Sequence, residues 1–403
     1  MKKFSILGLC LAAGLTMSAQ ADLVKEVERT VKSGNFDYTE LKAKIDEMTQ
    51  NEETKGNAKT WMVAGNAAFA NYDALFLKVQ MGQEVDKKEM GLALVDGYDF
   101  MLKALPLDTV IDEKGKVKTK ESKKIAKAII ENHQSLMTIG EILLQQGDNE
   151  TTYKLLSLYV SLPNDARFEK IKENLNPEHI KYAYFYKAYV CLNSKRYDEC
   201  LEDCAKANEL GYNDKQLYDV ALGAAFSCQN LKAAYDYAEK AYQLYGEEDS
   251  NYLKNIINID VYNKEFDKAK TLLNGLIQKE PNNAEYYDLL GALLDSEGKQ
   301  DEAIANYKKS IELNPSSAIT RLNFGRLLYN KAYAIDNQSS ALPPAQYDKI
   351  RAEQTEPLLR EAAAQLEEAY KLDELNMGEA VKILKNIYYI LGDEENLKRA
   401  EMM

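Results

Sequence analysis

The chain has 403 residues, of which 45% are hydrophobic and 29% charged, as expected for a folded protein that can bury a large core. Asp and Glu number 64 against 51 Lys and Arg, and the resulting net charge of −13 disfavours nucleic acid as a partner. Only two histidines are present, which leaves few groups for acid–base catalysis or metal binding.

Residues 1–21 have the pattern of a secretory signal peptide. Charged residues precede a short apolar stretch, and a small-residue cleavage site ends at Ala21. We therefore expect an exported protein, most simply periplasmic, with an extracellular or membrane-associated location as alternatives. Cys10 raises the question of lipidation, but Leu9 stands where a lipobox needs a small residue. No other apolar stretch reaches the length of a membrane span, so none is expected.

A 34-residue period organises most of the remaining chain. Its clearest copy spans 284–315, where Gly291, Ala303 and Pro315 are evenly spaced. A shift by one period places a glycine, an alanine and a proline again at the equivalent positions. This pattern resembles the tetratricopeptide repeat (TPR). The resemblance implies an all-α fold, a right-handed α-solenoid in which antiparallel helix pairs form a superhelix. Taken together with the signal-like residues 1–21, the chain looks like an exported TPR protein of Gram-negative bacteria.

The residue types of the repeat have a packing reason. Each unit is expected to form two amphipathic helices that come closest where the first carries Gly291 and the second Ala303. Tyr307 is expected to fill the wider space further along, and Pro315 to end the second helix because it cannot continue one. Gly298 is expected to end the first helix in the left-handed conformation.

The register also predicts how the chain is divided. The first insertion, at residues 72–95, is expected to be helical, and the second, between Gly325 and Ala362, to have helical flanks around a loop. Residues 109–120 predict a short hairpin or a plain loop. The expected segments are a signal peptide at 1–21, N-terminal capping helices at 22–57, degenerate TPR units with an insertion and a linker loop at 58–180, regular TPR units at 181–317, and a TPR unit with an insertion plus a C-terminal capping unit at 318–403.

By resemblance to the family, the first helix of each pair lines a concave groove, at the second, fifth, ninth, twelfth and thirteenth positions of each unit. Asparagine can donate to and accept from a peptide backbone, and tyrosine adds stiff contact area with a polar tip. A solvated groove without a ligand would also carry such residues. The candidate binding residues are Tyr182, Phe185, Tyr189, Asn193, Asn251, Lys254, Asn258, Tyr262, Asp288, Arg326, Tyr329 and Asn330, with Asp295, Asn386 and Tyr389 at equivalent positions.

One specialisation of the family is incomplete in this chain. Chaperone-binding TPR domains clamp a terminal carboxylate, and Lys254 and Asn258 match the first element of that clamp. Leu289 stands where the next asparagine is needed, and Ile319 and Asn323 replace the basic pair. Binding of a terminal carboxylate through this clamp is therefore not expected.

No catalytic signature is found. The zinc-protease, nucleophile-elbow and phosphate-loop motifs are all missing. His133 and His179 are expected at the surface, each at the start of a helix. We therefore expect no enzymatic activity, no cofactor and no bound metal.

Four cysteines follow the signal segment: Cys191, Cys200, Cys204 and Cys228. We favour reduced thiols, with Cys200 and Cys204 serving as small buried apolar groups. A disulfide between Cys191 and Cys200 is the alternative, because the two are expected on facing helices and export exposes them to oxidation.

The function expected from these features is that of a non-enzymatic adaptor or assembly scaffold of the bacterial envelope. Its groove would hold one or more envelope proteins or peptide segments. Two alternatives stay open: a tyrosine-lined binding protein for a glycan or another small envelope ligand, and a spacer whose groove binds nothing.

Overall fold

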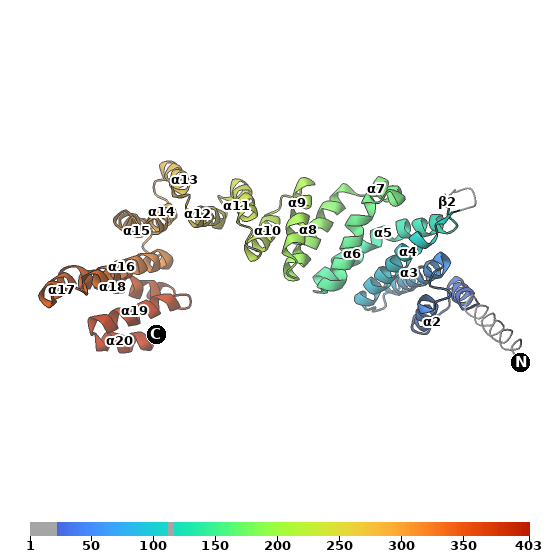
Figure 1. The fold of residues 1–403 in the computed structure, drawn as a ribbon, viewed down its shortest axis with the longest axis horizontal. Helices are drawn as coiled ribbons and strands as arrows, with labels where there is room; N and C mark the ends of the chain where they lie inside the picture. Colours follow the sequence, from blue (N-terminus) through green and yellow to red (C-terminus); the bar gives the residue numbers. More distant parts are fainter. Residues whose placement is uncertain (1–21, 112–116) are drawn as a thin grey trace, which may run out of the picture. The chain divides into compact units, whose positions relative to one another are not determined.

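The computed structural model describes residues 22–111 and 117–403 (Figure 1). The signal peptide expected at 1–21 and the centre of the segment 109–120 lie outside this range. The described residues are helical apart from one antiparallel pairing of β1 (Val110–Ile111) with β2 (Val117–Lys118) and short connections. The all-α expectation is thus confirmed. The chain forms two compact units, divided between Tyr237 and Ala238 and described separately below as unit 1 and unit 2.

Unit 1 begins with helical residues 22–33 and helix α2 (Tyr38–Gln50), the two helices expected there. The Asp37 carboxylate caps α2 by accepting hydrogen bonds from the backbone N–H groups of Thr39 and Glu40. Buried apolar residues of both helices pack against the start of the next helix, α3.

Helices α3 (Ala58–Gln80) and α4 (Lys87–Leu107) pack along their length as a pair (Figure 1). The insertion at 72–95 lengthens both helices, as expected, and leaves only a short turn between them. Gly65 makes room for the Met101 side chain, because a Cβ atom at this glycine would lie 2.8 Å from Met101 Cγ.

The β1–β2 pairing leads into α5 (Ser122–Gln145), whose start is fixed by Asp108. This carboxylate accepts hydrogen bonds from the backbone N–H groups of Lys120, Glu121 and Ser122. Helix α6 (Asn149–Ser161) pairs with α5, and the short helices η1 (Leu162–Asn164), η2 (Ala166–Phe168) and α7 (Glu169–Asn174) follow.

His133 corrects the expectation of a surface histidine at a helix start. It lies within α5, is 5% exposed, and its Nε2 atom is 2.9 Å from the carbonyl oxygen of Tyr159. The two rings stack with centroids 4.5 Å apart. The repeat register places a unit boundary at this residue, but α5 begins well before it, at Ser122.

Unit 1 continues with α8 (Pro177–Asn193), α9 (Tyr197–Glu209), α10 (Lys215–Ser227) and α11 (Leu231–Tyr245), whose last residues belong to unit 2. The four described cysteines are free thiols. Cys191, Cys200 and Cys204 lie in the core between α8 and α9 and are inaccessible to solvent.

Unit 2 contains α12 (Asn251–Tyr262), α13 (Phe266–Lys279), α14 (Ala284–Glu297), α15 (Gln300–Leu313), α16 (Ala318–Ser339), α17 (Pro344–Ile350), the π-helical turn η3 (Arg351–Thr355), α18 (Glu356–Leu372), α19 (Gly378–Leu391) and α20 (Glu394–Glu401). Gly298 ends α14 with φ +85°, the expected left-handed cap. The second insertion lengthens α16 and adds α17, so the loop expected in it shrinks to residues 340–343.

The contact at Gly291 differs in detail from the expectation. The atoms nearest to a Cβ built on this glycine belong to the Tyr307 ring, at 2.9 Å, and not to Ala303. Ala303 and Tyr307 are both fully buried in the core of unit 2.

Among the helices that the structure describes, none combines the length and the apolar character that crossing a membrane requires.

Candidate functional site

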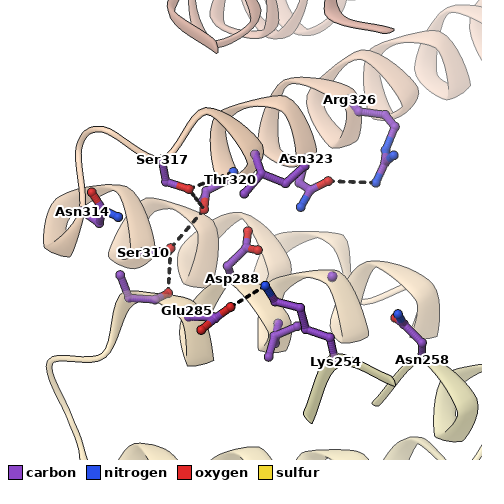
Figure 2. Close-up of a pocket in the computed structure, with 14 residues that line it drawn as sticks. Lys254, Asn258, Glu285, Asp288, Ser310, Asn314, Ser317, Thr320, Asn323 and Arg326 are labelled. Carbon is purple, nitrogen blue, oxygen red and sulfur yellow. Dashed lines mark hydrogen bonds and ion pairs between the residues drawn. The ribbon is translucent and has the colours of Figure 1, made fainter. Parts of the chain in front are cut away.

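A hollow of about 560 Å³, which we call the polar hollow, lies in unit 2 along the first helices of three successive helix pairs. Figure 2 shows side chains from α12, α14 and α16 pointing into it, together with residues of the turn between α15 and α16. Its lining residues are Lys254, Asn258, Ala284, Glu285, Asp288, Leu289, Ala292, Ser310, Asn314, Ser317, Ile319, Thr320, Asn323 and Arg326.

Hydroxyl groups build the wall where α15 meets α16. Ser317 caps α16, since its Oγ accepts a hydrogen bond from the Thr320 backbone N–H at 3.3 Å. Its Oγ also lies 2.8 Å from Thr320 Oγ1. Ser310 Oγ donates to the carbonyl oxygen of Ala284 at 2.8 Å and so ties the end of α15 to the start of α14.

The two cations of the polar hollow lie on its outer helices, and each has an acidic partner. Lys254 Nζ of α12 lies 2.6 Å from Glu285 Oε1 of α14 (Figure 2). Arg326 of α16 donates to Asn323 Oδ1 at 3.2 Å and to Glu379 Oε1 at 3.4 Å. These partly exposed pairs contribute little stability, which leaves both cations available to an acidic or carbonyl group of a ligand.

Asp288 lies between these pairs and forms no ion pair with the residues that the structure describes (Figure 2). Burial raises the pKa of its carboxyl above the ordinary value, although Asn323, Thr320 and Lys254 oppose the shift. Its Oδ1 atom has no hydrogen-bond partner among the described residues. The polar hollow therefore combines amides, hydroxyls and charges of both signs, which can pair with the N–H and C=O groups of an extended peptide.

A second hollow of about 430 Å³ lies in unit 1, and we call it the aromatic hollow. First helices of successive pairs again form it, through Leu144 of α5, Phe185, Tyr186 and Tyr189 of α8, and Gln216, Asp219 and Val220 of α10.

Phe185 was expected at an exposed groove position, and the structure corrects this. It is only 4% exposed, because its ring stacks on Tyr212 at a centroid distance of 4.5 Å. Tyr189 is 44% exposed and presents its ring to the aromatic hollow. Tyr182 is 37% exposed and meets Tyr212 edge-on, beside the residues that line the aromatic hollow.

The remaining candidate residues line neither hollow. Tyr329 is partly buried and stacks on Tyr333, with ring centroids 6.4 Å apart. Most of the others occupy the twelfth or thirteenth repeat position, near the end of the first helix, whereas the hollows form mainly around the fifth and ninth. The exposed candidates outside both hollows are Tyr182, Asn193, Asn251, Tyr262, Asn330, Asn386 and Tyr389.

Several lining residues of the polar hollow were not expected. Ser310, Asn314 and Ser317 belong to the end of a second helix or to the turn after it. Glu285 occupies the second position of the repeat in which Asp288 occupies the fifth, and it was not among the candidate residues. The available signal was the cluster of Asn and Ser around Pro315, which is typical of a turn followed by a capped helix.

Metal binding has no support in the part of the chain that the structure describes. In this part of the chain, no three His, Cys, Asp or Glu side chains lie close enough together to share a metal ion.

Comparisons with known proteins agree with the repeat register. A family model described as TPR repeat matches residues 296–338, which span α15 and α16. The chain thus contains a TPR repeat in this segment. No curated protein matches the chain.

Several solved structures of TPR proteins are similar. A TPR repeats protein from Bacteroides fragilis has 15% identity, covers 64% of this chain and 98% of its own, and gives a TM-score of 0.32. YrrB, described as a TPR protein with an unusual peptide-binding site, has 20% identity, 53% and 95% coverage and a TM-score of 0.30. MamA from Desulfovibrio magneticus RS-1 has 13% identity, 61% and 97% coverage and a TM-score of 0.27. These scores are low, so the fold is assigned from the chain's own helix pairs and repeat register.

Proposed function

We propose that this chain is a non-enzymatic adaptor that holds a segment of a partner protein in the polar hollow. The observation that carries the proposal is the set of side chains that α12, α14 and α16 direct into one space (Figure 2). Lys254, Asn258, Asn323 and Arg326 offer donors, and Asp288 offers a carboxylate with an unpaired oxygen. An extended peptide backbone needs donors and acceptors in alternation, and this surface supplies both.

We also propose that the partner is an envelope protein. The support is the signal-like pattern of residues 1–21, which predicts export to the periplasm of a Gram-negative bacterium. Cell fractionation of the tagged protein tests this part separately, because an intracellular location would remove envelope proteins from consideration.

Site-directed photocrosslinking tests the polar hollow itself. Ile319 lines the polar hollow and is 54% exposed, so a photoreactive residue placed there can reach a bound segment. Ala305 on α15 is also exposed but lies outside the polar hollow, and a photoreactive residue there is the matched control. A crosslinked partner from position 319 and none from 305 supports the proposal, and the reverse pattern contradicts it.

The aromatic hollow favours a second candidate function, binding of a glycan or another small envelope ligand. Tyr189 presents a partly exposed ring there, next to the polar groups of Gln216 and Asp219. Aromatic rings provide a flat apolar platform, and their polar neighbours can bond hydroxyl groups. Calorimetric titration of the native protein and of the variant Tyr189→Ala with soluble cell-wall glycan fragments separates this function from peptide binding.

A further inference from the structure

A third hollow, of about 650 Å³, lies in unit 1 between α5 and the segment formed by η2 and α7. We call it the basic hollow. Four cations from these two walls line it, namely Lys123 and Lys127 of α5, Arg167 of η2 and Lys170 of α7. Glu131 and Glu169 are its acidic lining residues. The lining therefore has a surplus of positive charge in a chain whose net charge is −13.

The cations of the basic hollow differ in whether they have a partner. Lys127 Nζ lies 3.6 Å from Glu131 Oε1, and Arg167 is held by Asp165, with Nη2 to Oδ2 at 2.6 Å. Lys123 and Lys170 make no ion pair with any residue that the structure describes. Two exposed ammonium groups on opposite walls are thus available to a ligand.

Both walls of the basic hollow are fixed to the same core. Ile125 and Ile129 of α5 are fully buried, as is Phe168 at the end of η2, and Ile171 of α7 is 3% exposed. These residues belong to one apolar cluster, so core packing sets the backbone positions from which the neighbouring cationic side chains extend.

The floor of the basic hollow is apolar. Ala126 and Ile130 of α5 line it and are half-buried, and Ala166 lines the opposite wall. A ligand that fits must therefore bring negative groups to the rim and an apolar group to the floor. The volume lies within the range of about 300–1,000 Å³ that is typical of ligand sites.

We propose that the basic hollow binds an acidic segment of a partner protein, in which carboxylates flank an apolar side chain. Charge complementarity to Lys123 and Lys170 favours negative groups. The half-buried Ala126 and Ile130 in the lining favour an inserted side chain over a planar lipid surface, and the overall acidity of the chain opposes a nucleic acid. The site lies in unit 1 and is independent of the polar hollow of unit 2.

Binding of a labelled acidic peptide to the full chain tests this proposal. The probe is a fluorescein-labelled octapeptide of six glutamates and two leucines, and its binding is measured by fluorescence anisotropy. The control peptide has the same sequence with every glutamate replaced by glutamine. We expect the glutamate peptide alone to bind, and its affinity to fall as salt rises from about 0.05 to about 0.5 M, because added ions screen the attraction.

A double charge reversal locates the site. The variant Lys123→Glu, Lys170→Glu is expected to bind the peptide at least ten-fold more weakly. Lys349→Glu, Lys382→Glu in unit 2 changes the net charge equally at exposed lysines that also make no ion pair with described residues, and is expected to bind normally. Equal weakening in both variants, no binding of the glutamate peptide, or binding of anionic phosphatidylglycerol vesicles in place of the peptide would overturn the proposal.

Discussion

A Cβ atom placed on Gly291 of α14 would lie 2.9 Å from ring atoms of Tyr307 on α15. Other helix pairs repeat this relationship, with Gly140 against Leu156, Gly325 against Leu366 and Gly65 against Met101. The sequence separation is identical in the pairs without an insertion, 291–307 and 140–156. It is more than doubled in the two inserted pairs, 65–101 and 325–366, where the same contact is nevertheless preserved. Insertions therefore lengthen the helix pairs without changing where they touch.

The first prediction concerns this contact. Gly291→Ala places a methyl group against the fully buried Tyr307 ring and is expected to destabilise the chain by about 1–3 kcal/mol, the usual cost of overpacking. Gly275→Ala in α13 is the control, because a Cβ there meets nothing within 4 Å. The control should gain roughly 0.5–1 kcal/mol from the better helix propensity of alanine. Urea unfolding measures both, and equal effects would contradict the packing role of Gly291.

The second prediction concerns His133 and acid. Burial lowers the pKa of His133, although its hydrogen bond to the Tyr159 carbonyl opposes the shift. The folded state therefore binds a proton less readily than the unfolded state, and the stability that neutral His133 provides is lost as pH falls below about 6.5. The stability difference between the wild type and His133→Gln should shrink as pH drops from about 7.5 toward 5. A difference that stays constant over this window would show that His133 is not protonated more readily on unfolding.

The third prediction concerns Asp288 and neutral pH. Burial raises the pKa of this carboxyl, so the folded state holds its proton more tightly than the unfolded state. Its ionised form at pH 7 costs stability, and that cost disappears as pH falls toward the unfolded value of about 3.9. Asp288→Asn should therefore be more stable than the wild type at pH 7 but not at pH 4, while partner binding weakens. A less stable variant at pH 7 would mean that the carboxylate is held by partners stronger than Asn323 and Thr320.

The fourth prediction concerns the thiols. Cys191, Cys200 and Cys204 are inaccessible, and burial raises the pKa of Cys191 to about 12, so none should react with a thiol reagent in the native protein. Of the four cysteines that the structure describes, only the partly exposed Cys228 is expected to react. After denaturation without reductant, the chain from residue 22 onward should show all four thiols. Two thiols would indicate the disulfide between Cys191 and Cys200 instead.

The helix pairs could be predicted from the sequence because their signals are local. Gly298, which lies between Gly291 and Ala303 in the sequence, predicts where α14 ends, and in the structure this glycine is the left-handed cap of α14. His133 was misplaced because the helix that contains it starts well before the repeat unit does. The repeat alone gives no measure of how far such an extension runs.

The walls of the polar hollow could be predicted only in part. Lys254, Asn258 and Asp288 follow from the repeat positions of the first helices. Ser310 and Thr320 do not, because they come together where one pair meets the next, and that geometry depends on packing between pairs. The expectation that Phe185 is exposed was wrong for the same reason. Tyr212, in the connection between α9 and α10, covers its ring, and the repeat positions do not predict this contact.

The central claim is that the polar hollow holds a partner segment, and in-cell crosslinking followed by recovery of the tagged protein tests it most directly. The test variant is Lys254→Ala, Asn258→Ala, Arg326→Ala. The ion pairs of Lys254 and Arg326 that it removes are partly exposed and contribute only about 0–1 kcal/mol each to the free energy of unfolding, so the fold should persist. The control variant is Asn306→Ala, Lys308→Ala, Lys309→Ala on the part of α15 outside the polar hollow. A partner recovered with the wild type and the control but lost with the test variant is the predicted result. Recovery of the same partner with all three proteins would contradict the claim and place binding on another surface.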